Sequence, residues 1–197
     1  MLYPCAMHAN RFLVIVGSVR PLRRAVTIAG WVAGLGAEAC GARFEVVDLK
    51  SLKLKLDDEP GLPAKGVYAH AATRRWSKLV REAAGVVFVT PQYNWGYPAA
   101  LKNAIDHLFD EWSGKPALIV TYGAHGGDRC SAQLREVLTG VDARVAIAAP
   151  ALRLTREQIV ADDGAVDPAR DFESEREGVV GALAELVALA GIETVAR

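Results

Sequence analysis

The sequence is poor in the residues that would indicate a disulfide scaffold or a metal centre. It has 3 cysteines in 197 residues, Cys5, Cys40 and Cys130, and no CxxC spacing. An odd number of widely separated thiols favours reduced cysteines in a cytoplasmic protein over a disulfide framework. The 4 histidines do not supply the short ligand spacings of a zinc site, so we expect no bound metal.

The sequence also lacks an excess of one charge and any long apolar run. Lys+Arg and Asp+Glu each number 23, so a nucleic-acid partner is not expected. The longest early apolar run, residues 12–16, is too short for a signal-peptide core or a membrane span. Hydrophobic residues make up 51% of the chain, so disorder is not expected. The length, with no internal repeat or linker, predicts one domain over residues 1–197, with residues 1–10 as a flexible tail.

Five strand-like runs alternate with five helix-like segments. The runs lie at residues 12–16, 43–49, 85–90, 116–122 and 143–149. Three of them are apolar through the middle, which is typical of strands covered on both faces. Amphipathic periodicity predicts helices at residues 24–40, 67–84, 98–112, 128–139 and 172–190. This order predicts an α/β fold, a three-layer sandwich around a parallel sheet.

Two polar stretches interrupt this pattern. Residues 50–66 contain charges, two prolines and two glycines, and residues 151–171 are polar and acidic. We expect both to form loops, and long loops in a small domain are often functional or mobile.

Ligands of open parallel sheets bind beyond the carboxyl ends of the strands, so the residues after each strand are the candidates for chemistry. After the first predicted strand, GSVRPLRRA places Ser18, Arg20 and Arg23 before a helix N-terminus, which favours an anion. The stretch is neither the GxGxxG fingerprint nor a Walker A loop. An ordinary strand-to-helix turn with exposed arginines is the alternative.

Two further loops of this kind follow. After the third predicted strand, PQYN crowds polar and aromatic groups at one strand end, although a structural turn is the alternative. After the fourth, YGAHGGDRC has glycines that allow close backbone approach before a helix, although a plain turn is again possible. Together the three loops indicate one ligand with a phosphate at one end and a flat polar ring at the other.

Three stretches of this sequence resemble a known family: GSVRPLRRAV, TPQYNWGYPAALKNAIDHLFDEWSGKPALIVTYGAHGG and QLREVL. They are similar to the NADPH-dependent FMN reductases, flavodoxin-like proteins that include quinone, azo-dye and chromate reductases. The resemblance covers about residues 12–149. It implies a five-stranded parallel sheet in the order 2-1-3-4-5, and a homodimer or homotetramer with FMN near the subunit interface.

The resemblance implies three groups of cofactor-binding residues. The FMN phosphate would be held by Ser18 and Arg20, helped by Arg23 and the backbone of Ala25 and Val26. The isoalloxazine would lie along Pro91, Gln92, Tyr93 and Asn94. Its pyrimidine side would be bordered by Tyr122, Gly123, Gly126 and Gly127. The N–H groups of Gly126 and Gly127 would stabilise negative charge on the reduced flavin.

This sequence departs from the family pattern at two of these positions and at two neighbouring ones. Ala25 stands where Ser or Asn is common, and Gln92 stands where Glu is common. Trp95 and His125 replace residues that are often small, so we expect a narrower pocket above the flavin. His125 is the one candidate for proton donation or for binding the nicotinamide phosphate, although a solvated loop histidine is the commoner case.

The activity that the resemblance implies is transfer of a hydride from NADPH or NADH through FMN to a small-molecule acceptor. That acceptor would be a quinone, an azo compound, a metal oxyanion or free flavin. The cofactor carries the chemistry, so no catalytic side-chain set is expected. The alternatives are a flavodoxin-like electron carrier, against which the neutral charge counts, and a non-enzymatic binding module.

Overall fold

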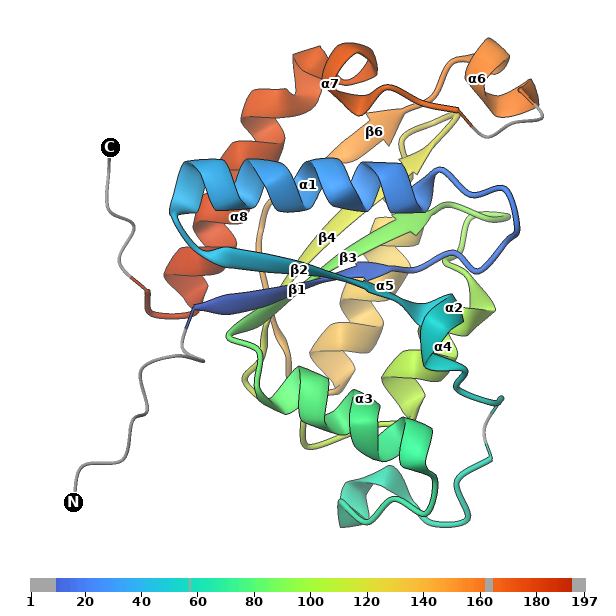
Figure 1. Ribbon diagram of the computed structural model, residues 1–197, viewed down its shortest axis with the longest axis vertical. Coiled ribbons are helices and arrows are strands. Elements are labelled where there is room, and N and C mark those ends of the chain that lie inside the picture. Colours follow the sequence, from blue (N-terminus) through green and yellow to red (C-terminus); the bar gives the residue numbers. More distant parts are fainter. Residues whose placement is uncertain (1–9, 57, 162–164, 193–197) are drawn as a thin grey trace.

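A parallel sheet separates two layers of helices in the computed structural model, which describes residues 10–56, 58–161 and 165–192 (Figure 1). The strands are β1 (Arg11–Val16), β2 (Arg43–Asp48), β3 (Gly85–Pro91), β4 (Pro116–Gly123), β5 (Arg144–Val145) and β6 (Ala151–Arg153). Their order is β2-β1-β3-β4-β5, and β6 also pairs with β4 in parallel. The predicted three-layer sandwich and strand order are confirmed. Of the predicted tail at residues 1–10, only Asn10 is described.

The helices cover both faces of the sheet (Figure 1). One face carries α1 (Ala25–Cys40), α7 (Pro168–Asp171) and α8 (Arg176–Leu189). The other carries α2 (Leu49–Leu52), α3 (Ala71–Arg81), α4 (Ala99–Asp106) and α5 (Asp128–Gly140). The short α6 (Arg156–Val160) lies beyond the end of β6, and single 3-10 turns are formed at Pro63–Lys65 and Glu173–Glu175.

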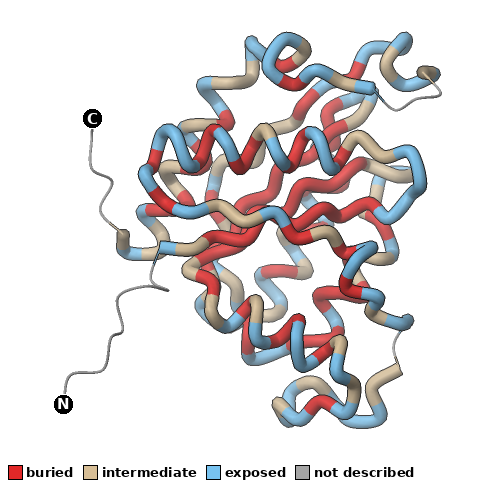
Figure 2. Tube along the Cα trace, viewed as in Figure 1, coloured by how far each residue is buried: buried red, intermediate tan, exposed pale blue. Residues whose placement is uncertain are grey.

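The alternation of side chains along β1 explains why the sheet is covered twice. Phe12, Val14 and Val16 belong to the core cluster under α1 and α8. Leu13 and Ile15 point to the other face and join the cluster under α3, α4 and α5. Figure 2 shows the buried strands between helices that are buried only on their inner sides. A strand with two buried faces is apolar at every position, which is the signal that the sequence carried.

Two predicted helices are longer than the observed ones. At one end of each, a carboxylate side chain accepts hydrogen bonds from backbone N–H groups. The helix predicted at residues 67–84 begins at Ala71, since Glu59 accepts the N–H groups of Ala69 (2.7 Å) and His70 (3.0 Å). The helix predicted at residues 98–112 ends at Asp106. There the Glu111 carboxylate accepts the N–H of Phe109 at 3.3 Å, a donor that helix continuation would need.

The predicted loop at 151–171 and the last predicted helix are also corrected. Residues 151–171 contain β6, α6 and α7 in place of an irregular loop. The helix predicted from residue 172 begins at Arg176, because Phe172 is not helical (φ −124°, ψ 30°) and is fully buried against Trp31, with 6.0 Å between the ring centroids.

The fifth strand is the clearest correction. A continuous strand was expected over residues 143–149, but β5 holds only Arg144 and Val145. The N–H groups of Ile147 and Ala148 donate to the Glu185 carboxylate of α8, at 2.6 and 3.1 Å, and Pro150 has no N–H to donate. The chain therefore leaves the sheet and rejoins β4 as β6.

Two properties of the described residues bear on function. No helix within residues 10–56, 58–161 and 165–192 is both long and apolar enough to cross a membrane. Over the same ranges, no group of three or more His, Cys, Asp or Glu side chains is arranged to hold a metal ion.

Candidate functional site

A cavity of about 300 Å³ opens at the carboxyl ends of the parallel strands. It brings together the loops after β1, β3 and β4, as the topology of an open parallel sheet requires. Seven of the predicted site residues line it: Arg20, Arg23, Pro91, Gln92, Tyr93, Tyr122 and Gly123. Five lining residues were not predicted: Leu22, Arg24, Ala124, Leu154 and Ile159.

One end of the cavity is built to receive an anion. Arg23 and Arg24 line it, and the Nε–H of each is buried without a hydrogen-bond partner among the described residues. Arg23 is paired with Asp48 through Nη2, and its side chain is only 10% exposed. A buried, unpaired N–H is unfavourable, so an acceptor in the cavity would satisfy both guanidinium groups.

The first turn of α1 follows directly after Arg24 in the chain. Ala25 and Val26 form its first turn, which has neither a side-chain cap nor an acidic residue. Their N–H groups point along the helix axis and carry the partial positive charge of a helix N-terminus. Neither residue lines the cavity, and the Val26 side chain is exposed, so the contact of their backbone with a phosphate stays a prediction.

Ser18 and Arg20 connect the anion end to the ring end. Ser18 is fully buried, and its Oγ lies 2.9 Å from the Tyr93 hydroxyl. The Arg20 guanidinium lies over the Tyr93 ring, 3.9 Å from its centroid. Tyr93 is thus held by a hydrogen bond at its tip and by a cation on its face.

The PQYN loop ends in a two-residue hairpin turn. Tyr93 and Gly96 exchange both backbone hydrogen bonds, at 2.8 and 2.9 Å, and the central residues Asn94 and Trp95 have φ of 48° and 70°. Asn tolerates this left-handed conformation, whereas a bulky residue such as Trp is strained there. The turn lifts Asn94 to the surface, outside the residues that line the cavity.

Gln92 is fixed between two elements. Its N–H donates to the Tyr122 carbonyl of β4 at 3.1 Å, and its Oε1 accepts the Cys130 N–H at the start of α5 at 3.2 Å. Within the described residues its Nε2 has no acceptor, which leaves this side-chain amide to donate into the cavity. A carboxylate here would accept from Cys130 but would have no donor left to offer.

The glycine loop differs from its predicted geometry. The N–H of Gly126 donates to Gly123 at 3.1 Å and that of Gly127 to His125 at 2.9 Å, so both groups are used within the turn. Neither glycine lines the cavity. Gly127 (φ 123°) lies against Thr121, whose Cβ would be 2.6 Å from an added Cβ. Both glycines therefore position the loop, and Gly123 and Ala124 are the residues of this loop that face the cavity.

Trp95 and His125 meet above this loop. Their rings stack with 6.5 Å between centroids, and the Arg129 guanidinium lies 4.3 Å from the Trp95 centroid. The stack joins the hairpin turn to the β4–α5 loop at the cavity rim. Both side chains are exposed, and neither belongs to the lining, so the narrower pocket expected above the flavin stays a prediction.

Tyr122 closes the floor of the cavity. It is 5% exposed, and burial together with the nearby Tyr93 raises the pKa of its hydroxyl well above the usual range. Tyr122 therefore stays neutral at any physiological pH and serves as a flat, uncharged surface. A neutral floor beside a cationic end suits a ligand that has a ring and a phosphate.

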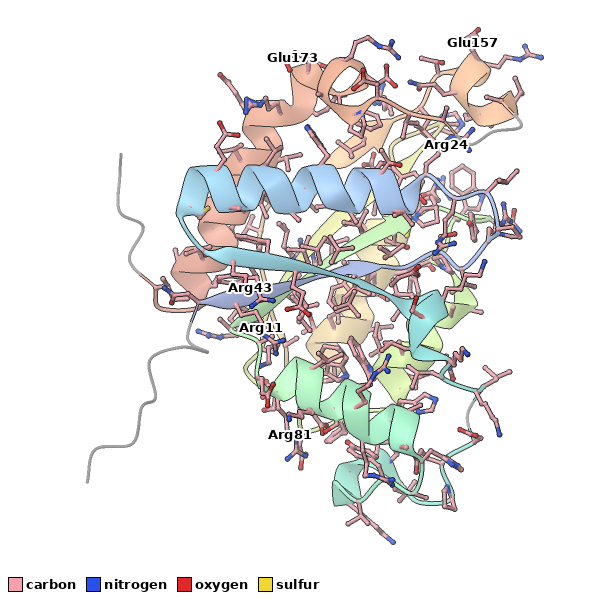
Figure 3. The ribbon with its side chains drawn as sticks, in the orientation of Figure 1. Arg11, Arg24, Arg43, Arg81, Glu157 and Glu173 are labelled. Carbon is pink, nitrogen blue, oxygen red and sulfur yellow. The ribbon has the colours of Figure 1, made fainter. Side chains whose placement is uncertain are left out.

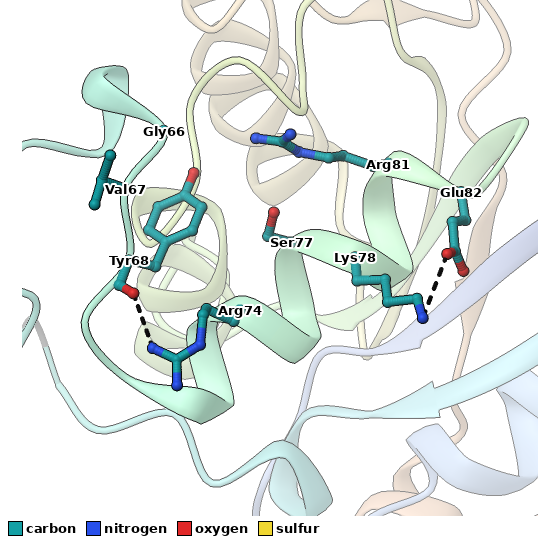
Figure 4. Close-up of a pocket in the computed structure, with 8 residues that line it drawn as sticks. All are labelled: Gly66, Val67, Tyr68, Arg74, Ser77, Lys78, Arg81 and Glu82. Atoms are coloured by element: carbon teal, nitrogen blue, oxygen red, sulfur yellow. Dashed lines mark hydrogen bonds and ion pairs between the residues drawn. The ribbon is translucent and has the colours of Figure 1, made fainter.

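A second cavity, of about 600 Å³, lies away from the strand ends, beside α3 (Figure 4). Tyr68 and Ser77 line it, and behind them the fully buried Glu111 carboxylate accepts from Tyr68 (2.8 Å), Ser77 (2.6 Å) and Arg81 (2.9 Å). The charged groups on its rim are already paired, as Arg74 is with the Tyr68 carbonyl at 2.9 Å. We regard this region as structural.

The five lining residues that were not predicted differ in whether a sequence motif marks them. Arg24 adjoins Arg23 and follows the same motif, so a count of cations in the loop would have found it. Leu22, Leu154 and Ile159 are apolar residues in polar stretches, and no motif marks them. Only the folding of residues 154–161 back over the strand ends brings two of them to the cavity.

The fold and the cavity define a class: a flavodoxin-like protein with a cationic end, a flat aromatic wall and an amide donor at its strand ends. The donor set fits FMN, since two buried unpartnered Nε–H groups match a phosphate and the amide of Gln92 matches a polar ring edge.

Comparison with known proteins gives the family. The family model described as NADPH-dependent FMN reductase matches residues 10–153. The chain is 51% identical over 164 residues to an NAD(P)H-dependent FMN reductase of Schizosaccharomyces pombe, covering 82% of this chain and 81% of that protein. It is 38% identical over 106 residues to a quinone reductase of Escherichia coli, covering 51% of this chain and 53% of that protein.

A solved structure agrees with the fold. The flavoenzyme NAD(P)H:(acceptor) oxidoreductase FerB from Paracoccus denitrificans superposes with a TM-score of 0.68 at 24% identity, covering 92% of this chain and 97% of that one. At this identity the likeness shows the fold alone. The chain belongs to the NADPH-dependent FMN reductase family and is an oxidoreductase that uses NAD(P)H and FMN.

Proposed function

We propose that the cavity at the strand ends binds FMN and that the protein uses NAD(P)H to reduce a quinone. The observation that carries this proposal is the pair of buried, unpartnered Nε–H groups of Arg23 and Arg24 beside a wall of Tyr93 and Tyr122. When bound, FMN accepts a hydride from NAD(P)H and passes the electrons to the acceptor.

The phosphate end of the site is assigned to the first loop. Arg23, Arg24 and the first N–H groups of α1 would hold the phosphate oxygens, with Ser18 and Arg20 completing the shell. Ser18 also fixes Tyr93, so this loop would position the ring as well as the phosphate.

The ring end is assigned to the loops after β3 and β4. Pro91, Gln92 and Tyr93 would lie along the ring, with Asn94 supporting the turn behind them. Gly123 and the N–H groups of Ala124 and His125 would border its pyrimidine side. In the described part of the chain, nothing accepts a hydrogen bond from the N–H groups of Ala124 and His125. Donors that are already oriented stabilise negative charge where it develops.

The choice of a quinone as the acceptor rests on the exposed aromatic side chains near the cavity. Trp95 and His125 offer exposed flat surfaces where a second ring would approach. The relative in Escherichia coli is named a quinone reductase. An azo compound, a metal oxyanion and free flavin are the other acceptors to be compared.

The first test is a visible spectrum of the purified protein with FMN, before and after anaerobic NADPH. We expect flavin absorption that bleaches on addition of NADPH and returns on addition of a benzoquinone. Flavin binding without bleaching by NADPH or NADH would identify an electron carrier. Steady-state rates with a quinone, an azo dye, chromate and free FMN would then rank the acceptors, and a higher kcat/KM for another class would replace the quinone.

We also infer a homodimer or homotetramer that works in the cytoplasm. Support for assembly comes from large exposed apolar side chains near α3 and α4, among them Val67 (76% exposed) and Phe109 (46%). Support for a reducing compartment comes from the free thiols of Cys40 and Cys130. Light scattering on the purified protein and imaging of a fluorescent fusion test these two statements; a monomer or an organellar signal would contradict them.

A further inference from the structure

One wall of the cavity is made by residues 154–161, which follow β6 and include α6. Leu154 and Ile159 of this segment line the cavity. None of the residues of α6 is buried, and a helix of this length is not stable alone. The segment, which we call the α6 wall, therefore depends on contacts from outside itself.

Arg24 supplies such a contact. Its Nη2 donates to the carbonyl oxygens of Gln158 and Ala161, the latter at 3.3 Å. These carbonyls lie at the C-terminal end of α6, where backbone acceptors lack helical partners and a cation is favourable. Figure 3 shows Arg24 at the start of α1, below α6 and the labelled Glu157.

The same guanidinium group also offers a hydrogen-bond donor to a ligand in the cavity. Arg24 lines it, and its Nε–H is buried with no acceptor among the described residues. A guanidinium group is planar and rigid, so a hydrogen bond at one edge restricts the direction of the others. An anion on Nε would therefore also fix the two bonds that hold the α6 wall.

We propose that Arg24 couples recognition of a phosphate in the cavity to ordering of the α6 wall, and so makes the site selective for FMN over riboflavin. The phosphate accepts from Nε while Nη2 holds the carbonyls of Gln158 and Ala161. A flavin without a phosphate fills the ring end but leaves the wall as mobile as before. The inference rests on the proposed function, because it takes the cavity as the flavin site.

Hydrogen exchange at the α6 wall tests the coupling. The amides of Ile159 and Ala161 are suitable reporters, because they donate to Thr155 (3.1 Å) and Glu157 (3.0 Å) within the wall. We expect FMN, and inorganic phosphate at high concentration, to slow their exchange at least severalfold. Riboflavin at saturation is expected to leave it within about twofold.

Substitutions of Arg24 separate its two roles. Arg24→Gln is expected to weaken FMN binding by about 10- to 100-fold, the range for loss of a charge-assisted hydrogen bond, and to abolish the protection. Arg24→Lys keeps the charge but not the planar fork, so part of the affinity should remain without the protection. The matched control is Arg74→Gln. Arg74 also donates to two carbonyls, those of Tyr68 and Ala69, but beside the second cavity, so FMN affinity should not change.

A substitution in the α6 wall tests the coupling without altering α1. A folding defect in α1 therefore cannot explain its effect on FMN binding. Thr155 caps α6 by accepting the Gln158 N–H at 3.2 Å, and it does not line the cavity. Because coupling between two sites is reciprocal, Thr155→Ala should weaken FMN binding by about three- to tenfold and riboflavin binding by less than twofold.

The outcomes are distinct. If wild-type protein binds FMN but exchange at Ile159 and Ala161 is unchanged, or if Arg24→Gln binds FMN as tightly as wild type, the coupling is wrong and the proposed function stands. If wild-type protein binds no FMN in a fluorescence titration, the assignment of the cavity fails and the coupling fails with it.

Discussion

The hydroxyl groups of Ser18 and Tyr93 lie 2.9 Å apart and join the loop after β1 to the loop after β3. Ser18 is fully buried, and its Oγ also accepts the Arg20 N–H at 3.5 Å. The phosphate end and the ring end of the cavity are therefore held at a fixed spacing by one bond. A ligand that must occupy both ends depends on that spacing.

Tyr93→Phe tests this bond. The substitution leaves the ring under Arg20 but removes the partner of the Ser18 hydroxyl, so we expect FMN affinity to fall by about tenfold, the value of a buried hydrogen bond of roughly 1.4 kcal/mol. The measurement is quenching of FMN fluorescence. Tyr97→Phe is the control, because its hydroxyl has no partner in the described part of the chain, and its affinity should stay within about twofold. Equal affinities for both variants would show that the bond does not position the cofactor.

Trp95 gives a prediction about strain. Asn at this position accepts a φ of 70° more easily than Trp, a relief of about 1 kcal/mol. The loss of an exposed cation–π contact with Arg129 opposes it by about 0.5–1 kcal/mol. We therefore expect Trp95→Asn to change the free energy of unfolding by less than about 1 kcal/mol, measured by urea denaturation, while KM for the acceptor changes.

The control for this variant is a buried tryptophan. Trp112 is 1% exposed, and Trp112→Ala should lose about 3–5 kcal/mol through the cavity that it leaves. If Trp95→Asn lost as much as Trp112→Ala, Trp95 would be a packing residue and its position at the rim would say nothing about the acceptor.

Glu111 gives a prediction about pH. Burial alone would raise the pKa of its carboxyl group, but hydrogen bonds from Ser77 and Tyr68 outweigh burial and hold the pKa below the ordinary 4.5. Because the folded-state pKa is the lower one, this contribution to stability is present above the unfolded-state pKa and is lost as the pH falls through the folded-state value.

Glu111→Gln is the corresponding variant. It removes the charge of a buried group that accepts hydrogen bonds from Tyr68 and Ser77, while the Arg81 side chain is 55% exposed and stays solvated. We therefore expect a loss of about 1.5–3 kcal/mol in the free energy of unfolding at pH 7. The difference from wild type should shrink at about pH 3.5. Glu136→Gln, at an exposed position, should match wild type at both pH values. A difference that stayed constant with pH would mean that the carboxylate charge is not the stabilising feature.

Alanine substitutions at Gly127 and Gly34 are expected to change the free energy of unfolding in opposite directions. Gly127→Ala should lose about 2–4 kcal/mol, because φ is 123° and the new Cβ would lie 2.6 Å from the Thr121 Cβ. Gly34→Ala, at an exposed site in α1 with no atom within 4 Å, should gain about 0.5–1 kcal/mol from helix propensity. Thermal unfolding of both variants measures this, and a Gly127→Ala protein as stable as wild type would contradict the packing described for the β4–α5 loop.

The sequence predicted the sheet order and most of the cavity because both follow from strong local signals. Strands with two buried faces are apolar throughout, and ligand loops follow them at the same edge. The predicted lengths of α3 and α4 were wrong because two carboxylates accept backbone N–H groups near one end of each helix. Glu59 lies ten residues before Ala69, and the Glu111 carboxylate, two residues after Phe109, is held in place by tertiary hydrogen bonds from Tyr68 and Ser77. No local pattern encodes such a contact.

Prediction of the site from the sequence is limited in the same way, by contacts that no local pattern encodes. The motif residues Arg20, Gln92 and Tyr93 line the cavity, because their loops follow strands of the parallel sheet. Ile159 was not found, because it reaches the cavity only when the chain after β6 turns back over the strand ends. Gly126 and Gly127 were assigned as donors from their position before a helix, but hydrogen bonds within the turn had already used their N–H groups.

The break between β5 and β6 has a consequence for how copies of this protein meet. An edge strand with free N–H groups is a template for another sheet. Here Glu185 takes the N–H groups of Ile147 and Ala148, and Pro150 offers none. The sheet therefore cannot be extended along this stretch of its border, even though the Ile147 side chain is 90% exposed there. One carboxylate and one proline therefore protect the folded protein, on this side, from strand-to-strand association with another copy.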